Sequence, residues 1–169
     1  VPIKYYAIAI IFILFDLDPY IYAGSEKRGD EPQPNQAALS RTSEVALSLK
    51  ELLDSLGLES FVKTSGATGM HIYVPIVRNL PYSVVRAAAN TVCLELLSRR
   101  PKEVTMEGDT TKRTGKVFLD ANQNARHKNL AVDCSPRAKP GATVSMPLRW
   151  DEVGRVKATD FTLGTVPDL

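Results

Sequence analysis

The distribution of apolar and polar residues predicts a strand close to the beginning of the chain. Residues 5–15 form an apolar run that is rich in β-branched side chains and shows no polar face. A run of this kind is typical of a strand that is buried on both faces. It is shorter than the roughly 20 residues of a membrane span, and the acidic residues that follow it do not resemble a signal-peptide cleavage site. We therefore expect a buried central strand and no membrane association.

Two later segments show the spacing of amphipathic helices. In residues 43–58 apolar side chains recur every three or four positions, and Gly57 is expected to end the helix. A second helix is expected to begin at Pro81 and to end before Pro101. The side chains on its expected buried face are Val84, Val85, Ala88, Val92 and Leu96.

Short apolar or alternating segments predict the remaining strands. They lie at residues 61–63, 71–76, 103–107, 116–120 and 130–134. Residues 23–36 are polar and indicate a surface loop, whereas residues 135–150 contain too much Pro and Gly for regular structure. Strands and two helices around one core predict an α+β (mixed α/β) fold. At 169 residues the chain has the length of a single domain, residues 1–169.

Charge is unevenly distributed, although the net charge of the chain is only +2. Between Arg99 and Arg149 there are eleven Lys or Arg residues against five Asp or Glu residues. This excess suits a polyanionic partner such as nucleic acid, but a solvated surface gives the same count. The two cysteines, Cys93 and Cys134, have the spacing of neither a metal site nor a disulfide framework, so a cytoplasmic protein is expected.

Two aspartates follow the first apolar run in the sequence FDLDP. Asp16 and Asp18 close the predicted strand, and residues i and i+2 of a strand point to the same face. Neighbouring carboxylates repel each other unless a cation lies between them, and Mg²⁺ and Mn²⁺ prefer such oxygen ligands. Solvated aspartates before a turn are the alternative. Because the strand is so apolar, we expect the pair at the carboxyl edge of a buried sheet, where ligands bind.

A third aspartate ends another predicted strand, in the sequence KVFLD. Alternation places Lys116, Phe118 and Asp120 on one face of that strand and its apolar neighbours on the other. A single aspartate in this position is more often a turn residue. Three aspartates at strand ends nevertheless fit a two-metal centre, which activates an attacking oxygen and stabilises a leaving phosphate.

The sequence FVKTSGATGMHIYVP places a glycine-rich loop between two predicted strands. Ser65, Gly66, Thr68 and Gly69 can present N–H groups and hydroxyls to phosphate oxygens, although the Gly-Lys-Ser/Thr of a Walker loop is absent. His71 follows the loop and can donate to a phosphate, although a lone histidine at the start of a strand is more often structural.

Two arginines can add cationic contacts to the same phosphates. Arg113 precedes the strand that ends in an aspartate, and Arg137 lies in the sequence SPRAKPG. The guanidinium fork matches phosphate oxygens in a bidentate manner. A solvated or helix-capping arginine is the alternative at each position.

With these residues considered together, the chain resembles the archaeo-eukaryotic primase superfamily. Within it, the resemblance is to the repair polymerase that occurs as a domain of bacterial ligase D and as a stand-alone protein in archaea. Four stretches carry the resemblance, in the family's order: FDLDP, LGLESFVKTSGATGMHIYVP, GKVFLDANQN and SPRAKPGATVSMPLRWDEV. The resemblance implies a primase-polymerase-like core with a mostly antiparallel or mixed sheet flanked by helices. It also implies a single catalytic domain that lacks the N-terminal segment usual in the family.

The resemblance implies a role for each candidate residue. Asp16, Asp18 and Asp120 would be catalytic carboxylates that bind Mn²⁺ or Mg²⁺. The residues expected near the incoming nucleoside triphosphate are Ser65, Gly66, Thr68, His71, Arg113 and Arg137. The basic half of the chain is expected to contact DNA through Arg126, Lys128 and Lys139.

The implied reaction is template-directed addition of nucleotides, preferably ribonucleotides, to 3′ ends at broken or gapped DNA. It would belong to non-homologous end joining, with Ku and a DNA ligase as partners, and the protein would be associated with the nucleoid. The chain departs from the family at Thr68, where many relatives have lysine, and at Cys134, where relatives often have an aromatic residue. Its loop at residues 23–36 is also longer than usual.

Two other classes of protein remain open on the sequence. A phosphatase of the haloacid dehalogenase type also has an apolar strand that ends in DxD, but Pro19 and Tyr20 replace the residues that usually follow that motif. A non-catalytic nucleic-acid-binding module explains the basic half of the chain but not three carboxylates at strand ends.

Overall fold

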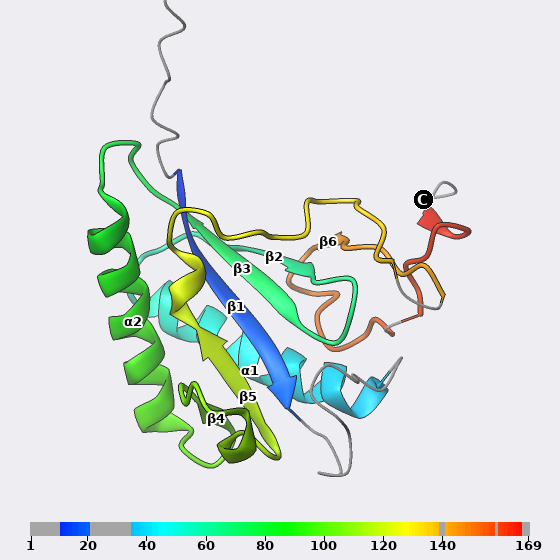
Figure 1. Cartoon of the computed structure of the whole chain (residues 1–169), viewed down its shortest axis with the longest axis horizontal. Helices are drawn as coiled ribbons and strands as arrows, with labels where there is room; N and C mark the ends of the chain where they lie inside the picture. Colours follow the sequence, from blue (N-terminus) through cyan, green and yellow to red (C-terminus); the bar gives the residue numbers. More distant parts are fainter. Residues whose placement is uncertain (1–10, 21–34, 139–140, 158, 167–169) are drawn as a thin grey trace, which may run out of the picture.

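The computed structural model describes residues 11–20, 35–138, 141–157 and 159–166. Within these residues six strands form one sheet in the order β4-β5-β1-β3-β2-β6 (Figure 1). The strands are β1 (Phe12–Tyr20), β2 (Phe61–Thr64), β3 (Met70–Pro75), β4 (Val104–Thr105), β5 (Lys116–Asp120) and β6 (Pro147–Leu148). The helices are α1 (Gln36–Ser55) and α2 (Tyr82–Arg99), with the short 3₁₀ turns η1 (Thr110–Lys112) and η2 (Ala121–Gln123).

Strand β1 lies in the interior of the sheet. It pairs antiparallel with β3 on one side and with β5 on the other. Strand β2 pairs antiparallel with β3 and β6, whereas β4 runs parallel to β5. The predicted α+β fold with a mixed, mostly antiparallel sheet is therefore confirmed. The central position of β1 also explains why its sequence is apolar without alternation.

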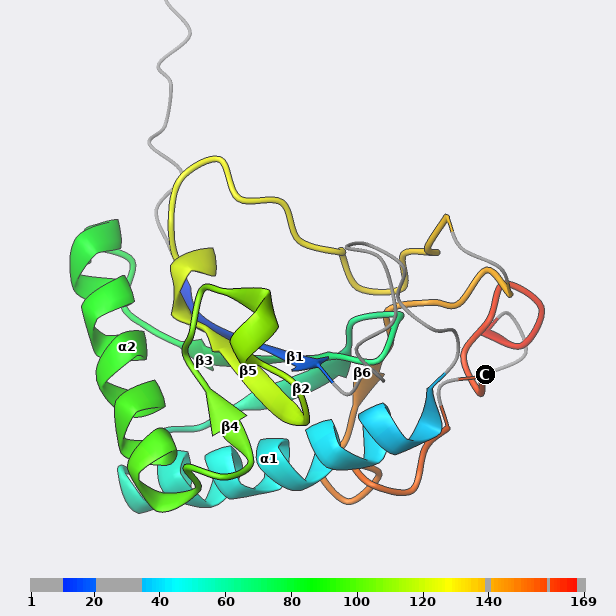
Figure 2. The same ribbon diagram turned by 60° about the horizontal axis from the view of Figure 1, so that its bottom comes forward.

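The two helices cover one face of the sheet (Figure 2). Helix α1 contacts β1, β3 and β5, and α2 contacts β1 and β4. Ile13, Phe15 and Leu17 of β1 join the same core as Leu49 and Leu53 of α1. We call the opposite face of the sheet the outer face; residues 129–133 cross it and line cavities there together with side chains of β1, β2 and β3.

Most of the predicted elements are confirmed. The predicted helix at residues 43–58 is α1, which begins earlier, at Gln36, because the side chain of Asn35 accepts a hydrogen bond from the N–H of Ala38 at 3.0 Å. The chain leaves the helix at Gly57, as predicted, with a φ of +70°. The predicted strands at residues 61–63, 71–76 and 116–120 correspond to β2, β3 and β5.

Two expectations about strands are wrong, and a third is confirmed only in part. Asp16 and Asp18 lie inside β1 and not at its end, because the strand continues to Tyr20 by pairing with β5. Pro19 is accommodated there since β1 pairs with β3 only as far as Leu17. The segment predicted as a strand at 103–107 is paired only over Val104–Thr105.

The second wrong expectation concerns residues 130–134, which form no strand. Their apolar side chains lie over the outer face of the sheet instead, and Cys134 has a φ of +58° that interrupts extended backbone. The expected buried face of α2 is also partly wrong. Val84 and Ala88 are exposed, and the buried positions are Val85, Ala89, Cys93 and Leu96.

Several expectations fall on residues that the structure does not describe. These are the first part of the apolar run, residues 5–10, nearly all of the polar loop at 23–36, and Lys139. In the described part of the chain, neither helix is long and apolar enough to cross a membrane.

Candidate nucleotide site

Three titratable side chains lie side by side on the outer face of the sheet. Asp16 on β1 is the direct pairing partner of His71 on β3 and of Asp120 on β5. Residues directly opposite each other in antiparallel strands carry their side chains on the same face, about 5 Å apart. The ladder therefore brings together three residues that are far apart in the sequence.

Asp16 is the most buried of these carboxylates, with 6% of its surface exposed. The Nε2 atom of His71 lies 3.4 Å from its Oδ1 atom. Oδ1 of Asp16 and Nδ1 of His71 are both buried, and neither has a hydrogen-bond partner among the described residues. Because buried polar atoms are nearly always paired, these atoms mark a place for a group that the described residues do not supply.

Asp18 lies two residues further along the same face of β1 and is exposed. Gly69 closely approaches this part of the strand: a Cβ atom at Gly69 would lie 2.7 Å from the carbonyl oxygen of Leu17 and 3.0 Å from Oδ1 of Asp18. Such distances leave no room for a side chain. The glycine therefore lets the loop lie directly against β1 at Leu17 and Asp18.

Asp120 ends β5, as predicted, and is half-buried. Its Oδ1 atom accepts a hydrogen bond of 2.9 Å from the backbone N–H of Asn122, so Asp120 is the N-cap of η2. Across the residues that the structure describes, no three Asp, Glu, His or Cys side chains are grouped closely enough to hold a metal ion. Asp16, Asp18 and Asp120 thus share one face without converging on a single point.

The glycine-rich loop is held closed by Ser65. The N–H of Ser65 donates to the carbonyl of Gly69 at 2.9 Å. The Ser65 Oγ atom accepts hydrogen bonds of 3.2 Å from the N–H groups of Ala67 and Gly69. The serine hydroxyl therefore organises the loop, and those two N–H groups point to it. Thr68 is buried.

Gly66 connects the loop to the segment that carries Arg137. It has a φ of +73°, and a Cβ atom there would lie 2.7 Å from Cγ of Arg137 and 2.9 Å from the backbone nitrogen of Ser145. The Thr143 hydroxyl donates to the Gly66 carbonyl at 2.5 Å. A larger residue at this position would separate Arg137 from the loop.

A polar cavity of about 210 Å³ lies where these parts meet, and we call it the Asp16 cavity. It is lined by Asp16, Asp18, Ser65, Ala67, His71, Asn129, Leu130, Ala131 and Arg137. Five predicted site residues, from β1, the loop, β3 and the segment before β6, thus surround one space. The lining does not include Gly66, Thr68, Arg113 or Asp120.

Arg113 is held away from this lining by other contacts. Its Nε and one terminal nitrogen donate to the carbonyls of Glu107 and Gly108 at 2.6 and 2.8 Å. Its guanidinium carbon lies 3.4 Å from the ring centroid of Phe118, and Phe118 is the pairing partner of Asp18. The arginine is therefore fixed over the strand next to Asp18.

The residues predicted to contact DNA lie elsewhere. Arg126 and Lys128 are exposed on the segment after η2. The guanidinium of Arg126 lies 5.9 Å from the ring centroid of Tyr82, and Lys128 lines a second cavity and not the polar one.

Sequence reasoning missed Lys63, a lysine that is only 2% exposed. It is the pairing partner of His71, so it extends the same row of side chains. Its ammonium donates to the carbonyl of Ala131 and lies 3.0 Å from the Asp133 carboxylate. Burial raises the pKa of the neighbouring Tyr73 phenol, and the charges of Asp133 and Asp16 raise it further.

Lys63 therefore fastens the segment 129–133, of which Asn129, Leu130 and Ala131 form one wall of the Asp16 cavity. The position of Lys63 in the strand Phe61–Thr64 indicates the outer face of the sheet. No sequence signal shows that residues 129–133 cover this face.

Asn124 was also missed, although it lies in GKVFLDANQN, one of the four stretches that carry the family resemblance. Its side chain accepts from the N–H of Leu14 at 2.8 Å and donates to the Leu14 carbonyl at 2.7 Å. The amide thus satisfies the backbone of β1 beyond the end of β5. This contact fixes the segment after Asp120 on the sheet.

Comparisons with known proteins agree with this geometry. A match to the family described as "LigD, primase-polymerase domain" covers residues 12–169. The chain therefore belongs to the LigD primase-polymerase domain family and is a nucleotidyltransferase domain. The resemblance to the end-joining polymerases of the primase superfamily is confirmed, and the phosphatase alternative is excluded by this membership.

Individual relatives support the assignment. The chain is 32% identical over 141 residues to the "Multifunctional non-homologous end joining protein LigD" of Mycolicibacterium smegmatis, which covers 83% of this chain and 17% of that protein. It is 33% identical over 117 residues to the protein of the same name from Pseudomonas aeruginosa, covering 69% of this chain and 14% of the relative. The "Bifunctional non-homologous end joining protein LigD" of Bacillus subtilis is 30% identical over 158 residues, or 92% of this chain and 24% of the relative.

A solved structure shares the fold. It is described as the polymerase domain from Mycobacterium tuberculosis ligase D in complex with DNA, and it matches with a TM-score of 0.70 at 30% identity. The match covers 86% of this chain and 46% of the solved chain. The chain thus spans less than a quarter of the length of these curated relatives and about half of the solved polymerase domain.

Proposed function

We propose that this domain adds nucleotides, ribonucleotides preferentially, to 3′ ends of broken or gapped DNA during non-homologous end joining. The observation that carries the proposal is the Asp16 cavity. Five residues with the chemistry of a nucleotide site line it together, in a chain of the LigD polymerase family. Its acidic side would face metal ions, and its loop and arginine side would face phosphate.

Asp16, Asp18 and Asp120 would hold Mg²⁺ or Mn²⁺ in a two-metal centre. Asp16 fits such an ion because its buried Oδ1 atom has no hydrogen-bond partner among the described residues, and carboxylate oxygens are the ligands these ions prefer. When bound, the ions supply positive charge at the attacking 3′ oxygen and at the reacting phosphate. The carboxylates themselves position the ions and exclude a second anion from the acidic side of the cavity.

The other residues would position the nucleoside triphosphate. Ser65 holds the loop of Gly66 and Thr68 in shape, so that the loop forms a rigid wall beside the aspartates. His71, next to Asp16, would donate a hydrogen bond from its ring to a phosphate oxygen. Arg137 would neutralise phosphate charge from the opposite wall, and Arg113 would do so from beside Asp18.

DNA is the proposed macromolecular partner. Support comes from the solved polymerase domain, which is described in complex with DNA, and from the exposed cations Arg126 and Lys128. Lys139 belongs to the same proposal from its sequence alone. Ku and a DNA ligase would be further partners, as the names of the relatives suggest for end joining, and the protein would act in the cytoplasm at the nucleoid.

Primer extension on a gapped duplex tests this function. We expect template-dependent extension that requires a divalent ion, proceeds with Mn²⁺ or Mg²⁺, and is faster with ribonucleotides than with deoxyribonucleotides. Absence of extension with every combination of metal and nucleotide would contradict the proposal. Equal rates with both kinds of nucleotide would contradict only the ribonucleotide preference.

A further inference from the structure

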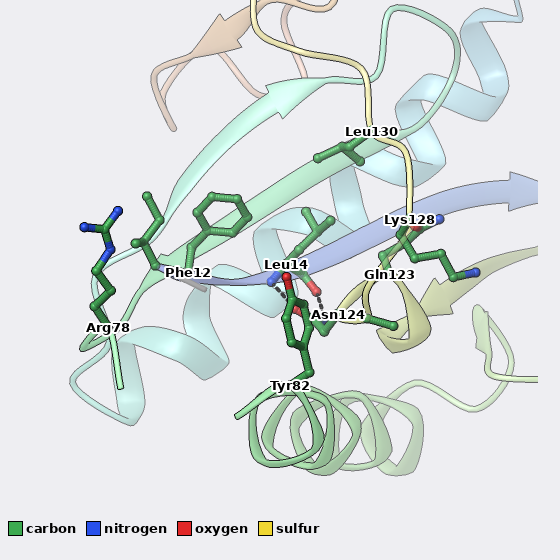
Figure 3. Close-up of a pocket in the computed structure, with 10 residues that line it drawn as sticks. Phe12, Leu14, Arg78, Tyr82, Gln123, Asn124, Lys128 and Leu130 are labelled. Carbon is green, nitrogen blue, oxygen red and sulfur yellow. Dashed lines mark hydrogen bonds between the residues drawn. The ribbon is translucent and has the colours of Figure 1, made fainter. Parts of the chain in front are cut away.

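A second cavity lies on the outer face of β1, on the side of Leu14 away from the aspartates, and we call it the Leu14 pocket (Figure 3). It has a volume of about 360 Å³. Phe12 and Leu14 of β1 form an apolar floor, and Tyr82 from the first turn of α2 points toward it. A pocket with an aromatic wall and an apolar floor accommodates a flat, uncharged ring.

Cations flank this apolar space. Arg78 and Lys128 both line the pocket, and they lie toward opposite ends of it (Figure 3). Arg126 adds a third positive charge 5.9 Å from the Tyr82 ring centroid. None of the described residues that line the pocket is acidic. A ligand that combines a flat ring with negative charge on both sides matches this distribution.

One polar group in the pocket also lacks a partner. The amide of Asn124 is fully used by the backbone of Leu14 and Ala121. The neighbouring Gln123 lines the same pocket, and its Oε1 atom is buried without a hydrogen-bond partner among the described residues. A side-chain amide offers a donor and an acceptor, the pattern that the edge of a nucleobase complements.

We infer that the Leu14 pocket binds one unstacked base of single-stranded DNA, with the adjoining phosphates on Arg78 and Lys128. Stacking on an aromatic side chain and cations along the backbone are the usual means of holding single strands. Leu130 lines both this pocket and the Asp16 cavity, so the base would lie directly beside the proposed nucleotide site. The inference rests on the proposed action on DNA and goes beyond it, because it assigns a separate place to a strand that is not paired.

The test measures binding by fluorescence anisotropy, without metal or nucleoside triphosphate, so that catalysis plays no part. The probes are a labelled single-stranded oligothymidylate and an abasic oligonucleotide of the same length. We expect the unmodified protein to bind the base-bearing probe about tenfold more tightly, as one stacked base contributes. Tyr82→Ala should remove this difference, and Tyr82→Phe should retain it.

Two further sets of variants separate stacking from charge. Arg78→Ala and Lys128→Ala should weaken both probes equally, each lowering the slope of log affinity against log salt by about 0.7. Lys102→Ala, an exposed lysine outside the pocket lining, is the control and should change the slope less. Phe61→Ala removes another exposed aromatic ring, outside the pocket lining, and should leave the base preference intact.

Photo-crosslinking supplies a readout that does not depend on affinity. An oligonucleotide with 5-iodouracil should crosslink to the peptide that contains Tyr82. The inference is overturned if the unmodified protein binds both probes equally, or if Phe61→Ala and not Tyr82→Ala abolishes the difference. If the protein binds neither probe, the inference fails together with the proposed DNA partner; equal binding to both refutes the base pocket alone.

Discussion

The outer face of β1 carries two sites of opposite character. Around Asp16 and Asp18 the cavity is small, polar and bordered by a loop and an arginine; around Phe12 and Leu14 the pocket is larger and has an apolar floor. The two sites lie on the same face of the sheet because alternate residues of a strand point to one side. A single strand can therefore present an acidic and an apolar surface in sequence. In the proposals above, the acidic part would face metal ions and the apolar part would face a flat base.

The largest effect is expected when a charge is removed from the Asp16 cavity and the Leu14 pocket is left unchanged. Asp16→Asn should lower nucleotide addition by at least about 100-fold, since a positioned electrostatic group is lost. Stability should not fall, because neighbouring carboxylates repel each other without a bound cation. Primer extension and urea unfolding measure the two quantities, with Asp54→Asn, on the exposed side of α1, as the matched control. Unchanged extension would show that chemistry does not occur at this end of β1.

The next effect tests the close contact between the glycine loop and β1. Gly69→Ala places a methyl group 2.7 Å from the Leu17 carbonyl oxygen, and we expect a loss of about 1–3 kcal/mol in the free energy of unfolding. Nucleotide addition should fall with it, whereas the base preference of the Leu14 pocket should persist. Gly108→Ala is the control, because nothing lies within 4 Å of its added methyl group. Equal stability of the two variants, measured by urea unfolding, would contradict the packing described.

The wall shared by the two sites depends on Lys63. Asp133→Asn leaves the buried ammonium without its carboxylate and should cost about 1 kcal/mol, a modest value because Asp133 is itself largely exposed. Lys63→Met should cost less stability, since it leaves a solvated carboxylate. Asp133→Asn and Lys63→Met should both speed hydrogen exchange at residues 129–133. Both should also weaken nucleotide addition and the binding of base-bearing single strands. Lys50→Met removes a lysine paired with Asp54 on α1 and should leave the exchange at residues 129–133 unchanged. Faster exchange in Lys50→Met, or unchanged exchange in Asp133→Asn and Lys63→Met, would contradict the role of Lys63 in holding this segment.

The smallest expected effect concerns the two cysteines, Cys93, which is buried on α2, and Cys134, which is exposed. Burial, together with a smaller contribution from the charge of Asp120, raises the pKa of the Cys93 thiol from 9.0 to about 12. The folded state therefore favours the protonated thiol. This contribution to stability is complete below pH 9.0 and is lost as the pH rises toward about 12.

Urea unfolding at pH 8 and pH 10.5 should show a larger loss of stability for the unmodified protein than for Cys93→Ala. A maleimide at neutral pH should label the exposed Cys134 and leave Cys93 unmodified. Rapid labelling of Cys93 in the folded protein would contradict its burial in the core.

The sequence predicted the elements that depend on local pattern. The strands at β2, β3 and β5 and the helix α1 follow from alternation and helical spacing, and Gly57 marks the end of α1 because a glycine adopts its positive φ readily. Ser65, His71 and Arg137 were selected for their chemistry, and the fold brings them to one cavity with Asp16 and Asp18.

The remaining features depend on contacts that no local pattern contains. The strand continues beyond Asp18 only because β5 pairs with it. In the segment 130–134, Leu130 and Ala131 are partly buried over the outer face of the sheet, whereas Val132 and Cys134 are exposed, so a composition that suggests a strand serves a different purpose here. Lys63 would be taken for a solvated lysine until the position of Asp133 is known.

The most direct test of the central claim uses Asp120→Asn. In the proposed reaction the third carboxylate helps to hold the ion that activates the primer 3′ oxygen, so removing its charge should abolish addition while triphosphate binding largely survives. The side chain keeps its size and can still cap η2 through its amide oxygen. Nucleotide binding and primer extension should be measured on the same protein, with Asp54→Asn as control. We expect near-normal binding and collapsed extension; retained extension would contradict a three-carboxylate polymerase site on this face of the sheet.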